Sequence, residues 1–226
     1  MTWKIGHRGA CGHAPENTLA SMQKALELGV DGFEFDIQMS GDGEPVVIHD
    51  DTLERTTSGR GFVSDYTFKE LQQFDAGKGE RIPSLRQVLD LVDGRCRLFI
   101  ELKAESSSGP VAAILREYVA RRGWSWEQLY VVAFDHSQLV AMRRLLPELR
   151  TGALLAGIPV SLAAIAAEAG AWSINPCIHH ISKALVDDAH WRGLKVVTWT
   201  ANEPRHIEKA RMLGVDAITS DFPDRL

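Results

Sequence analysis

The sequence predicts an α/β protein with a (β/α)8 fold, the TIM barrel, and three observations predict it. Eight short apolar runs alternate with segments of helical spacing, and this alternation indicates parallel strand pairing. Several helical segments stop just before a glycine, the usual residue past a helix end. The 226 residues also fit a barrel, which typically needs roughly 250 residues and at least about 200. We predict a single domain over residues 1–226, with an insertion at approximately 40–83.

The predicted elements follow one another without a linker rich enough in Pro, Gly or Ser to divide the chain. The predicted strands are short and apolar: Lys4–His7, Gly32–Gln38, Arg97–Lys103, Leu129–Phe134, Thr151–Leu155, Trp172–Asn175, Lys195–Thr200 and Asp216–Ser220. The predicted helices lie between them: Asn17–Leu28, Ser84–Val92, Val111–Arg122, His136–Leu146, Val160–Ala169, Lys183–Arg192 and Pro204–Leu213. Eight strands in this order predict a closed barrel.

The second and third predicted strands carry charges inside apolar runs. Glu34 and Asp36 alternate with phenylalanines and therefore share one face of their strand. Glu101 and Lys103 share one face of the next strand in the same way. Buried charges are costly unless something binds them, and three inward carboxylates predict a hard divalent cation. The alternatives are a solvent-facing edge strand for the first pair and a structural ion pair for the second, although a buried ion pair is a poor source of stability.

A ninth strand-like run, Pro45–His49, breaks the alternation. Only Ser40–Glu44 separates it from the second strand, and this loop is too short for a parallel crossover. Because the loop contains Asp42-Gly43, a hairpin turn signal, we predict an antiparallel return strand. With these two residues as the turn, Asp36 would face His49. Residues 50–79 are polar and rich in Gly, Thr and Ser, which predicts an inserted excursion.

Polar residues gather at the carboxyl ends of the predicted strands, where barrel enzymes place their active sites. They are His7, Arg8, Glu34, Asp36, His49, Asp50, Glu101, Lys103, Trp199 and Asp221. Metal ligands, an acid, a base and anion-binding cations form the inventory for attacking a phosphate ester. Asn17 and Asp221 also have a simpler interpretation as helix caps, Asn17 for the first helix and Asp221 for a final turn. Five other histidines have no partner that the sequence identifies: His13, His179, His180, His190 and His206.

Composition excludes several other classes of protein. The net charge of −5 gives no basic patch, so nucleic acid is not an expected partner. No apolar run approaches the ~18 residues of a membrane span. Three widely spaced cysteines form neither a zinc spacing nor a disulfide framework. No signal peptide precedes the first strand, and we therefore expect a cytoplasmic protein. No heptad or apolar stripe indicates an oligomeric state.

The motifs together resemble one known family. They run in that family's order over nearly the whole chain: His7-Arg8-Gly9, Pro15-Glu16-Asn17-Thr18, Glu34-Phe35-Asp36, Asp42-Gly43, Pro45-Val46-Val47-Ile48-His49-Asp50, Leu53 with Arg55-Thr56-Thr57 and Gly59, Glu101-Leu102-Lys103, Trp199-Thr200 with Asn202, and Asp221-Phe222-Pro223. This set resembles the glycerophosphodiester phosphodiesterase family. The resemblance implies a (β/α)8 barrel with a small insertion after its second strand. It also implies hydrolysis of a glycerophosphodiester to sn-glycerol 3-phosphate and an alcohol.

The resemblance implies a role for each matched position. Glu34, Asp36 and Glu101 would hold a divalent metal, usually Ca²⁺ or Mg²⁺ in such enzymes. His7 and His49 would act as general acid and general base, in an order that the sequence leaves open.

Three further positions would bind the substrate. Arg8 and Lys103 would contact the phosphate, and Trp199 would line the glycerol side. Two other functions stay open on the same barrel. One is a phospholipase of the sphingomyelinase D type, whose members are typically secreted and disulfide-bearing, unlike this chain. The other is a non-catalytic binder of phosphate ligands, which would be expected to lack a histidine or a metal carboxylate.

Overall fold

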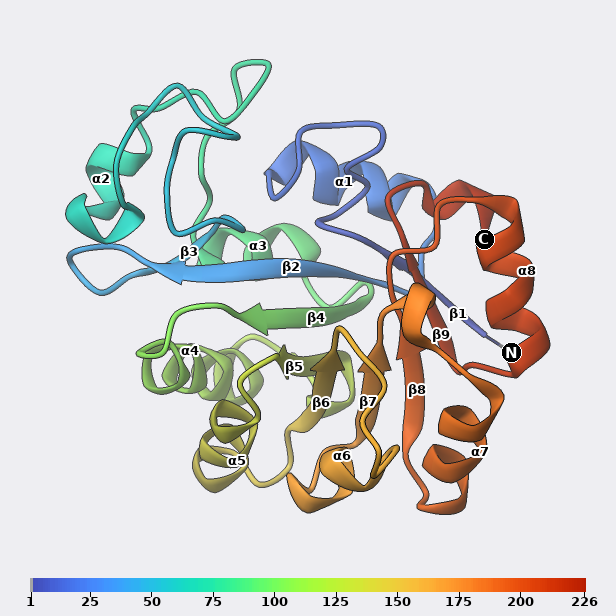
Figure 1. The fold of residues 1–226 in the computed structure, drawn as a ribbon. Coiled ribbons are helices and arrows are strands. Elements are labelled where there is room, and N and C mark those ends of the chain that lie inside the picture. The colour runs from blue at the N-terminus through green and yellow to red at the C-terminus, as the bar shows by residue number, and fades with distance from the viewer. Residues whose placement is uncertain (1) are drawn as a thin grey trace.

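Eight parallel strands close into a barrel in the computed structural model, which describes residues 2–226 (Figure 1). The barrel strands are β1 (Trp3–Gly6), β2 (Gly32–Met39), β4 (Arg97–Leu102), β5 (Leu129–Ala133), β6 (Arg150–Leu155), β7 (Ser173–Pro176), β8 (Lys195–Thr198) and β9 (Ala217–Ser220). Each strand pairs in parallel with the next, and β9 and β2 both pair with β1, which closes the ring. The predicted (β/α)8 barrel is confirmed.

Helices surround the barrel and cover its outer face (Figure 1). They are α1 (Leu19–Glu27), α3 (Leu85–Val92), α4 (Ser108–Arg121), α5 (His136–Leu145), α6 (Ala164–Glu168), α7 (Lys183–Trp191) and α8 (Pro204–Leu213), with short 3₁₀ turns η2 (Trp126–Gln128), η3 (Ile178–His180) and η4 (Pro223–Arg225). The α6 helix is shorter than the predicted Val160–Ala169. Leu162 takes a positive φ of 50°, a conformation that a helix does not continue through.

Two layers of apolar packing hold the barrel together. The outer layer lies between strands and helices and takes in Phe33, Phe35 and Ile37 of β2. The inner layer fills the barrel and consists of Ile5, Phe99, Tyr130, Val132, Leu154, Val197 and Ala217, with Trp3 and Trp172 packed against it. Trp3 stacks on Trp172 with ring centroids 5.9 Å apart. The interior is therefore a packed core, as in other barrels of this type.

The hairpin after β2 forms, but with a register one residue away from the predicted one. The return strand β3 (Pro45–Val47) pairs antiparallel with β2, and Ile37 lies opposite Val47. The turn has three central residues instead of two, with Gly43 at φ 84°, because a type I turn followed by a left-handed glycine also closes a hairpin. Ile48, not His49, then donates its backbone N–H to the Asp36 carbonyl. The predicted opposition of Asp36 and His49 is wrong.

The segment from residue 40 to residue 83 includes β3, and the part of it that follows β3 lies over the β2–β3 hairpin (Figure 1). It contains η1 (Val63–Asp65) and α2 (Phe68–Leu71), and Thr67 and Glu70 form a capping box at the start of α2. Its apolar side chains form a small cluster of their own: Val46, Ile48, Leu53, Val63, Leu71, Ala76 and Ile82. This cluster was not predicted, because its members are too far apart along the chain to produce a periodic pattern.

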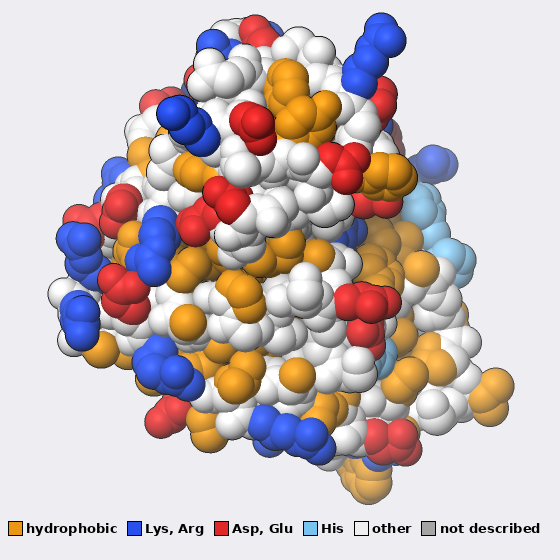
Figure 2. Space-filling model, turned by 90° about the vertical axis from the view of Figure 1, so that its left-hand side faces the viewer, with side chains coloured by type: hydrophobic (Ala, Val, Ile, Leu, Met, Phe, Trp, Pro, Cys, Tyr) orange, Lys and Arg blue, Asp and Glu red, His pale blue; other side chains and the backbone are white. Residues whose placement is uncertain are grey.

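The surface mixes charges of both signs. Figure 2 shows the face on the β2–β3 side, where basic and acidic side chains are interspersed among apolar ones. No helix within residues 2–226 combines the length and the apolar character needed to cross a bilayer.

Candidate active site

A pocket of ≈ 210 Å³ opens at the carboxyl end of the barrel. Its lining includes residues that the sequence singled out: His7, Arg8, Glu34, His49, Glu101, Lys103 and Trp199. Two further polar residues, Asn175 and Thr219, were not predicted, and the rest of the lining is apolar: Phe99, Val132, Phe134, Leu154 and Val197. The structure thus brings seven of the eight predicted site residues to one cavity. The eighth, Asp36, is only 1% exposed and contacts Arg8 and Lys103 of the lining.

Three carboxylates converge beneath this pocket. Glu34 and Asp36 come from β2, and Glu101 lies directly across from Asp36 in β4. One oxygen from each of the three lies within 4.8 Å of the others, and all three side chains are buried. The second Glu34 oxygen, Oε1, is buried without a hydrogen-bond partner. Buried acceptors are normally satisfied, so this cluster is arranged for something that is electropositive.

Burial and mutual repulsion disfavour charge in this cluster. Burial first, and then the neighbouring carboxylates Asp36 and Glu101, hold the pKa of Glu34 well above its usual range. Burial and Asp36 likewise raise the pKa of Glu101 to about 7, although Lys103 opposes the rise. A cation at the centre would reverse this repulsion, since a nearby positive charge favours the ionised form of a carboxyl group.

Two side-chain cations border the carboxylates and reach the pocket. Lys103 Nζ lies 2.6 Å from Glu101 Oε1 and 3.5 Å from Asp36 Oδ1. Arg8 Nε lies 3.5 Å from Asp36 Oδ2, and Arg8 Nη1 donates to Glu16 at 2.6 Å. Arg8 has a positive φ of 49°, and its backbone N–H donates to Glu34 Oε2 at 3.1 Å. Both cations are therefore held at the edge of the cluster, where an anionic ligand would meet them.

Asn17 supports the cluster. The sequence predicted it as the cap of the first helix, and this prediction is wrong. Thr18 is the cap of α1, with its hydroxyl accepting from the backbone of Ser21. Asn17 takes a φ of 58° and is buried. Its amide donates to Asp36 Oδ2 at 2.8 Å, and its carbonyl oxygen accepts from the Asp36 backbone N–H at 3.3 Å. The side chain thereby fixes the orientation of Asp36.

Replacing Asn17 tests that role. Asn17→Gly loses both hydrogen bonds to Asp36 and is expected to destabilise the fold by about 2–4 kcal/mol, since a buried charged acceptor loses its donor. Asn17→Ala loses the same bonds and must also hold a left-handed backbone, which adds roughly 1 kcal/mol. Urea unfolding of both variants measures the two costs. Equal stability of Asn17→Ala and the wild type would show that Asp36 does not need this partner.

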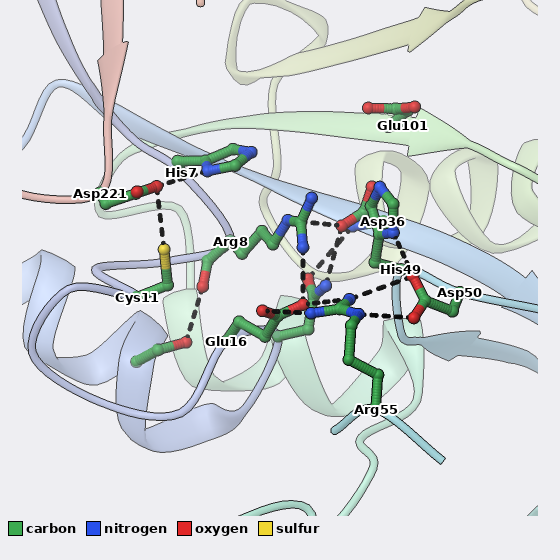
Figure 3. A network of polar contacts seen from close by, with 12 residues as sticks. His7, Arg8, Cys11, Glu16, Asp36, His49, Asp50, Arg55, Glu101 and Asp221 are labelled. Carbon is green, nitrogen blue, oxygen red and sulfur yellow. Dashed lines mark hydrogen bonds and ion pairs between the residues drawn. The ribbon is translucent and has the colours of Figure 1, made fainter. Parts of the chain in front are cut away.

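His7 forms the first histidine–carboxylate pair of the site. Its Nδ1 lies 2.6 Å from Asp221 Oδ1 (Figure 3). Its Nε2 lies 3.9 Å from Glu34 Oε2. Cys11 Sγ donates to the same Asp221 oxygen at 3.0 Å, and Asn202 donates to the other at 2.6 Å. Although burial opposes it, hydrogen bonding by His7 and Cys11 lowers the pKa of Asp221 to about 2. Asp221 therefore orients His7, and its interpretation as a cap is wrong, because Phe222 occupies the position before η4.

His49 forms the second pair. Its Nδ1 lies 2.6 Å from Asp50 Oδ1, and Arg55 Nε donates to Asp50 Oδ2 at 2.6 Å. Arg55 first, and then His49, lower the pKa of Asp50 to about 2. In both pairs one ring nitrogen is held by a carboxylate, and both histidines line the pocket. Both histidines were predicted from the sequence as site residues, whereas Arg55 had no predicted role.

The remaining wall of the pocket is mostly apolar. Trp199 follows β8, its Nε1 donates to the Asn175 carbonyl at 2.8 Å, and its ring packs edge-on against Phe134 with centroids 5.8 Å apart.

Two of the histidines for which the sequence identified no partner do have carboxylate partners, but away from this pocket. His13 contacts Asp224, and His190 contacts Asp216. The predicted separation of site histidines from the others therefore agrees with the lining of the pocket.

The carboxylate cluster also fits a divalent cation by its donor set. Ca²⁺ and Mg²⁺ prefer oxygen ligands, and the cluster offers oxygens from Glu34, Asp36 and Glu101 close together. The unpartnered Glu34 oxygen and the raised pKa values of Glu34 and Glu101 mark a site where a bound cation would favour the ionised carboxylates.

Fold and site together define the class of protein, a phosphodiesterase built on a (β/α)8 barrel. Residues 7–225 match the model of the Glycerophosphoryl diester phosphodiesterase family, and the chain belongs to this family. It is 34% identical over 234 residues to a glycerophosphodiester phosphodiesterase from Caldanaerobacter subterraneus, with 100% of this chain and 96% of the relative covered. It is 32% identical over 237 residues to one from Bacillus altitudinis, with 100% and 96% covered.

Two solved structures resemble the fold over nearly its full length. One is a phosphodiesterase from Oleispira antarctica in complex with the product sn-glycerol-3-phosphate, with a TM-score of 0.90, 32% identity, and 98% of this chain and 93% of the other covered. The other is a putative glycerophosphoryl diester phosphodiesterase from Silicibacter pomeroyi, with a TM-score of 0.91, 31% identity, and 100% and 91% covered. The chain is thus a glycerophosphodiester phosphodiesterase by family.

Proposed function

We propose that this enzyme hydrolyses glycerophosphodiesters to sn-glycerol 3-phosphate and an alcohol, and that it needs a divalent metal and two histidines to do so. One observation carries the proposal. Three buried carboxylates and two carboxylate-held histidines meet at a single pocket of the barrel. The Oleispira antarctica relative, solved with sn-glycerol-3-phosphate, supports the product.

Glu34, Asp36 and Glu101 would hold the metal, which we propose to be Ca²⁺ or Mg²⁺ because the donors are all oxygens. When bound, such an ion acts as a Lewis acid toward a phosphate oxygen, which is worth several kcal/mol of transition-state stabilisation. Asn17 fixes the orientation of Asp36, and Lys103 lies against both Glu101 and Asp36. The chain thus holds its ligands in place before any ion arrives.

The two histidines would move the protons. Because Asp221 holds Nδ1 of His7 and Asp50 holds Nδ1 of His49, Nε2 of each ring is left to face the reacting groups. A neutral ring then accepts a proton at Nε2 from the attacking hydroxyl, and a protonated ring donates one to the departing alcohol. Because a carboxylate supports each ring in the same way, either histidine could act as the general base and the other as the general acid.

Arg8 and Lys103 would bind the substrate phosphate, and Trp199 would line the glycerol. Both cations line the pocket beside the carboxylate cluster. Guanidinium and ammonium groups suit phosphate oxygens, Arg by a planar fork and Lys as a point charge. Trp199 lines the same cavity and packs against Phe134, whose ring centroid lies 5.8 Å from Lys103 Nζ. The pocket therefore offers both cationic and apolar groups to a ligand.

Release of glycerol 3-phosphate from glycerophosphocholine tests the proposed function. We expect hydrolysis with added Ca²⁺ or Mg²⁺, its loss with a chelator, and its recovery when the metal is returned. Binding of the substrate without turnover at any metal concentration would favour a non-catalytic phosphate binder. Turnover only of an acylated phospholipid would favour the sphingomyelinase D type of reaction.

The metal is expected to stabilise the protein more as the pH rises. Burial and Asp36 raise the pKa of Glu101 to about 7. A raised pKa stabilises the metal-free fold below the unfolded value, and this stability is lost as the pH rises through about 7. A divalent cation binds the ionised carboxylates and competes with those protons. Melting temperatures with and without metal should therefore differ little at about pH 5 and most at about pH 8. A difference that shrinks with rising pH would contradict this.

We also propose a reducing compartment such as the cytoplasm for this enzyme. Its three cysteines, Cys11, Cys96 and Cys177, are free thiols. Burial raises the pKa of Cys96 to about 12, so this thiol stays protonated and unreactive at neutral pH. A thiol titration of protein purified from its source tests the proposal, and disulfide-linked cysteines would contradict it.

A further inference from the structure

Arg55 lies between two carboxylates of the site and hydrogen-bonds to both. Its Nε and Nη2 donate to Asp50 at 2.6 and 3.1 Å. Its Nη1 and Nη2 donate to Glu16 at 2.9 and 2.8 Å. The guanidinium thus donates hydrogen bonds to two carboxylates at once, as Figure 3 shows. Arg55 belongs to the segment after β3, whereas Glu16 belongs to the loop between β1 and α1.

Each of the two carboxylates touches a different part of the site. Asp50 holds Nδ1 of His49 at 2.6 Å. Glu16 holds Nη1 of Arg8 at 2.6 Å. The chain of contacts therefore runs from Arg8, beside the carboxylate cluster, through Glu16, Arg55 and Asp50 to His49. It joins the two loops that would supply the phosphate-binding and the proton-transferring side chains.

We propose that Arg55 is a positioning residue for catalysis, which fixes His49 through Asp50 and Arg8 through Glu16. The proposal rests on the proposed function, in which His49 transfers a proton and Arg8 binds phosphate. It assigns to the segment spanning residues 40–83 a part in the active site beyond packing. The segment supplies a guanidinium that joins the two loops.

The chemistry of the contacts requires arginine at this position. A guanidinium presents donors in a planar fork that can bind two carboxylates at once. A lysine keeps the charge but has no fork, so it cannot fix both partners in the same geometry. The Arg55 side chain is 46% exposed, and exposed ion pairs contribute little to stability. Its removal should therefore disturb the site more than the fold.

The test compares Arg55→Ala and Arg55→Lys with Arg60→Ala as the matched control. Arg60 is an exposed arginine of the same segment and does not belong to the lining of the pocket. We expect Arg55→Ala to melt close to the wild type and to lose about 10–100-fold in kcat/KM, the usual cost of removing a group that orients a site residue. Arg55→Lys should recover only part of the loss, and Arg60→Ala should match the wild type.

Chemical rescue separates positioning from a general structural role. Added methylguanidinium should restore part of the activity of Arg55→Ala and should leave Arg60→Ala and His49→Ala unchanged. The low-field NMR signal of the His49 Nδ1 proton should shift or broaden in Arg55→Ala and return with methylguanidinium. Activity of Arg55→Ala within about twofold of the wild type would overturn the proposal. A loss that follows the melting temperature and resists rescue would also overturn it.

His49→Ala in the same assay distinguishes a failure of the proposed function from a failure of the role proposed for Arg55. If His49→Ala is as active as the wild type, the proposed function fails. If His49→Ala is inactive and Arg55→Ala is fully active, the role of Arg55 alone fails.

Discussion

Replacement of His49 by alanine is expected to lower kcat for glycerophosphocholine by about 10²–10⁴-fold, the usual contribution of one general acid or base. His49 lines the pocket, and its Nδ1 is held by Asp50 at 2.6 Å, so its loss removes a proton-transfer group that is already oriented. KM should change little, because phosphate binding is assigned to Arg8 and Lys103. Steady-state kinetics at saturating metal measures both constants.

A control histidine makes this result specific. His180, in η3, is exposed, and His180→Ala should keep wild-type rates. The melting temperature of each variant with bound metal shows whether the fold is intact. A loss of less than about tenfold in His49→Ala would remove His49 from proton transfer. His7→Ala should show a loss of the same order, since Asp221 supports His7 as Asp50 supports His49.

Replacement of Glu101 by glutamine is expected to change metal binding and stability in opposite directions. The variant keeps the shape of the side chain but loses a charge from the cluster, and metal affinity should fall by more than about 100-fold, beyond the usual cost of losing a supporting group. The metal-free protein should become more stable by about 1–3 kcal/mol at about pH 8, because one pKa unit corresponds to about 1.4 kcal/mol. Burial and Asp36 together hold the pKa of Glu101 at about 7.

Calorimetric titration and urea unfolding in chelator measure the two effects. Glu127→Gln is a suitable control, because that carboxylate is exposed at the opposite end of the barrel, before β5. A Glu101→Gln variant that binds metal as tightly as the wild type would remove Glu101 from the ligand set. A variant that is less stable than the wild type without metal would show that Glu101 serves Lys103 as a structural ion pair instead.

Local patterns were enough to predict the barrel and most of the site. The alternation of apolar runs and helical segments fixes parallel pairing, and the alternation within Gly32–Gln38 fixes which face carries Glu34 and Asp36. Parallel strands place their carboxyl ends together, so strand-end residues from β1, β2 and β4 meet without any knowledge of loops. This is why seven predicted site residues line the pocket.

Features that depend on turn geometry or on distant pairs were not predictable in this way. The choice between a two-residue and a three-residue turn at Asp42-Gly43 shifted the register of β3 by one residue. Asn17 and Asp221 were interpreted as caps because each lies at a local boundary of a helix. Their actual partners, Asp36 and His7, are 19 and 214 residues away along the chain. Arg55 was recognised only as part of a family motif, without a role, because its partner Glu16 is 39 residues away along the chain.

The most direct test of the account is the anomalous scattering of a crystal soaked with Mn²⁺, an ion that also prefers oxygen ligands. We expect one strong peak between the side chains of Glu34, Asp36 and Glu101, in contact with an oxygen from each, and its absence in a crystal of Glu101→Gln. A wild-type crystal with no peak at this position, or with manganese bound only elsewhere, would contradict the claim that these three carboxylates hold the metal.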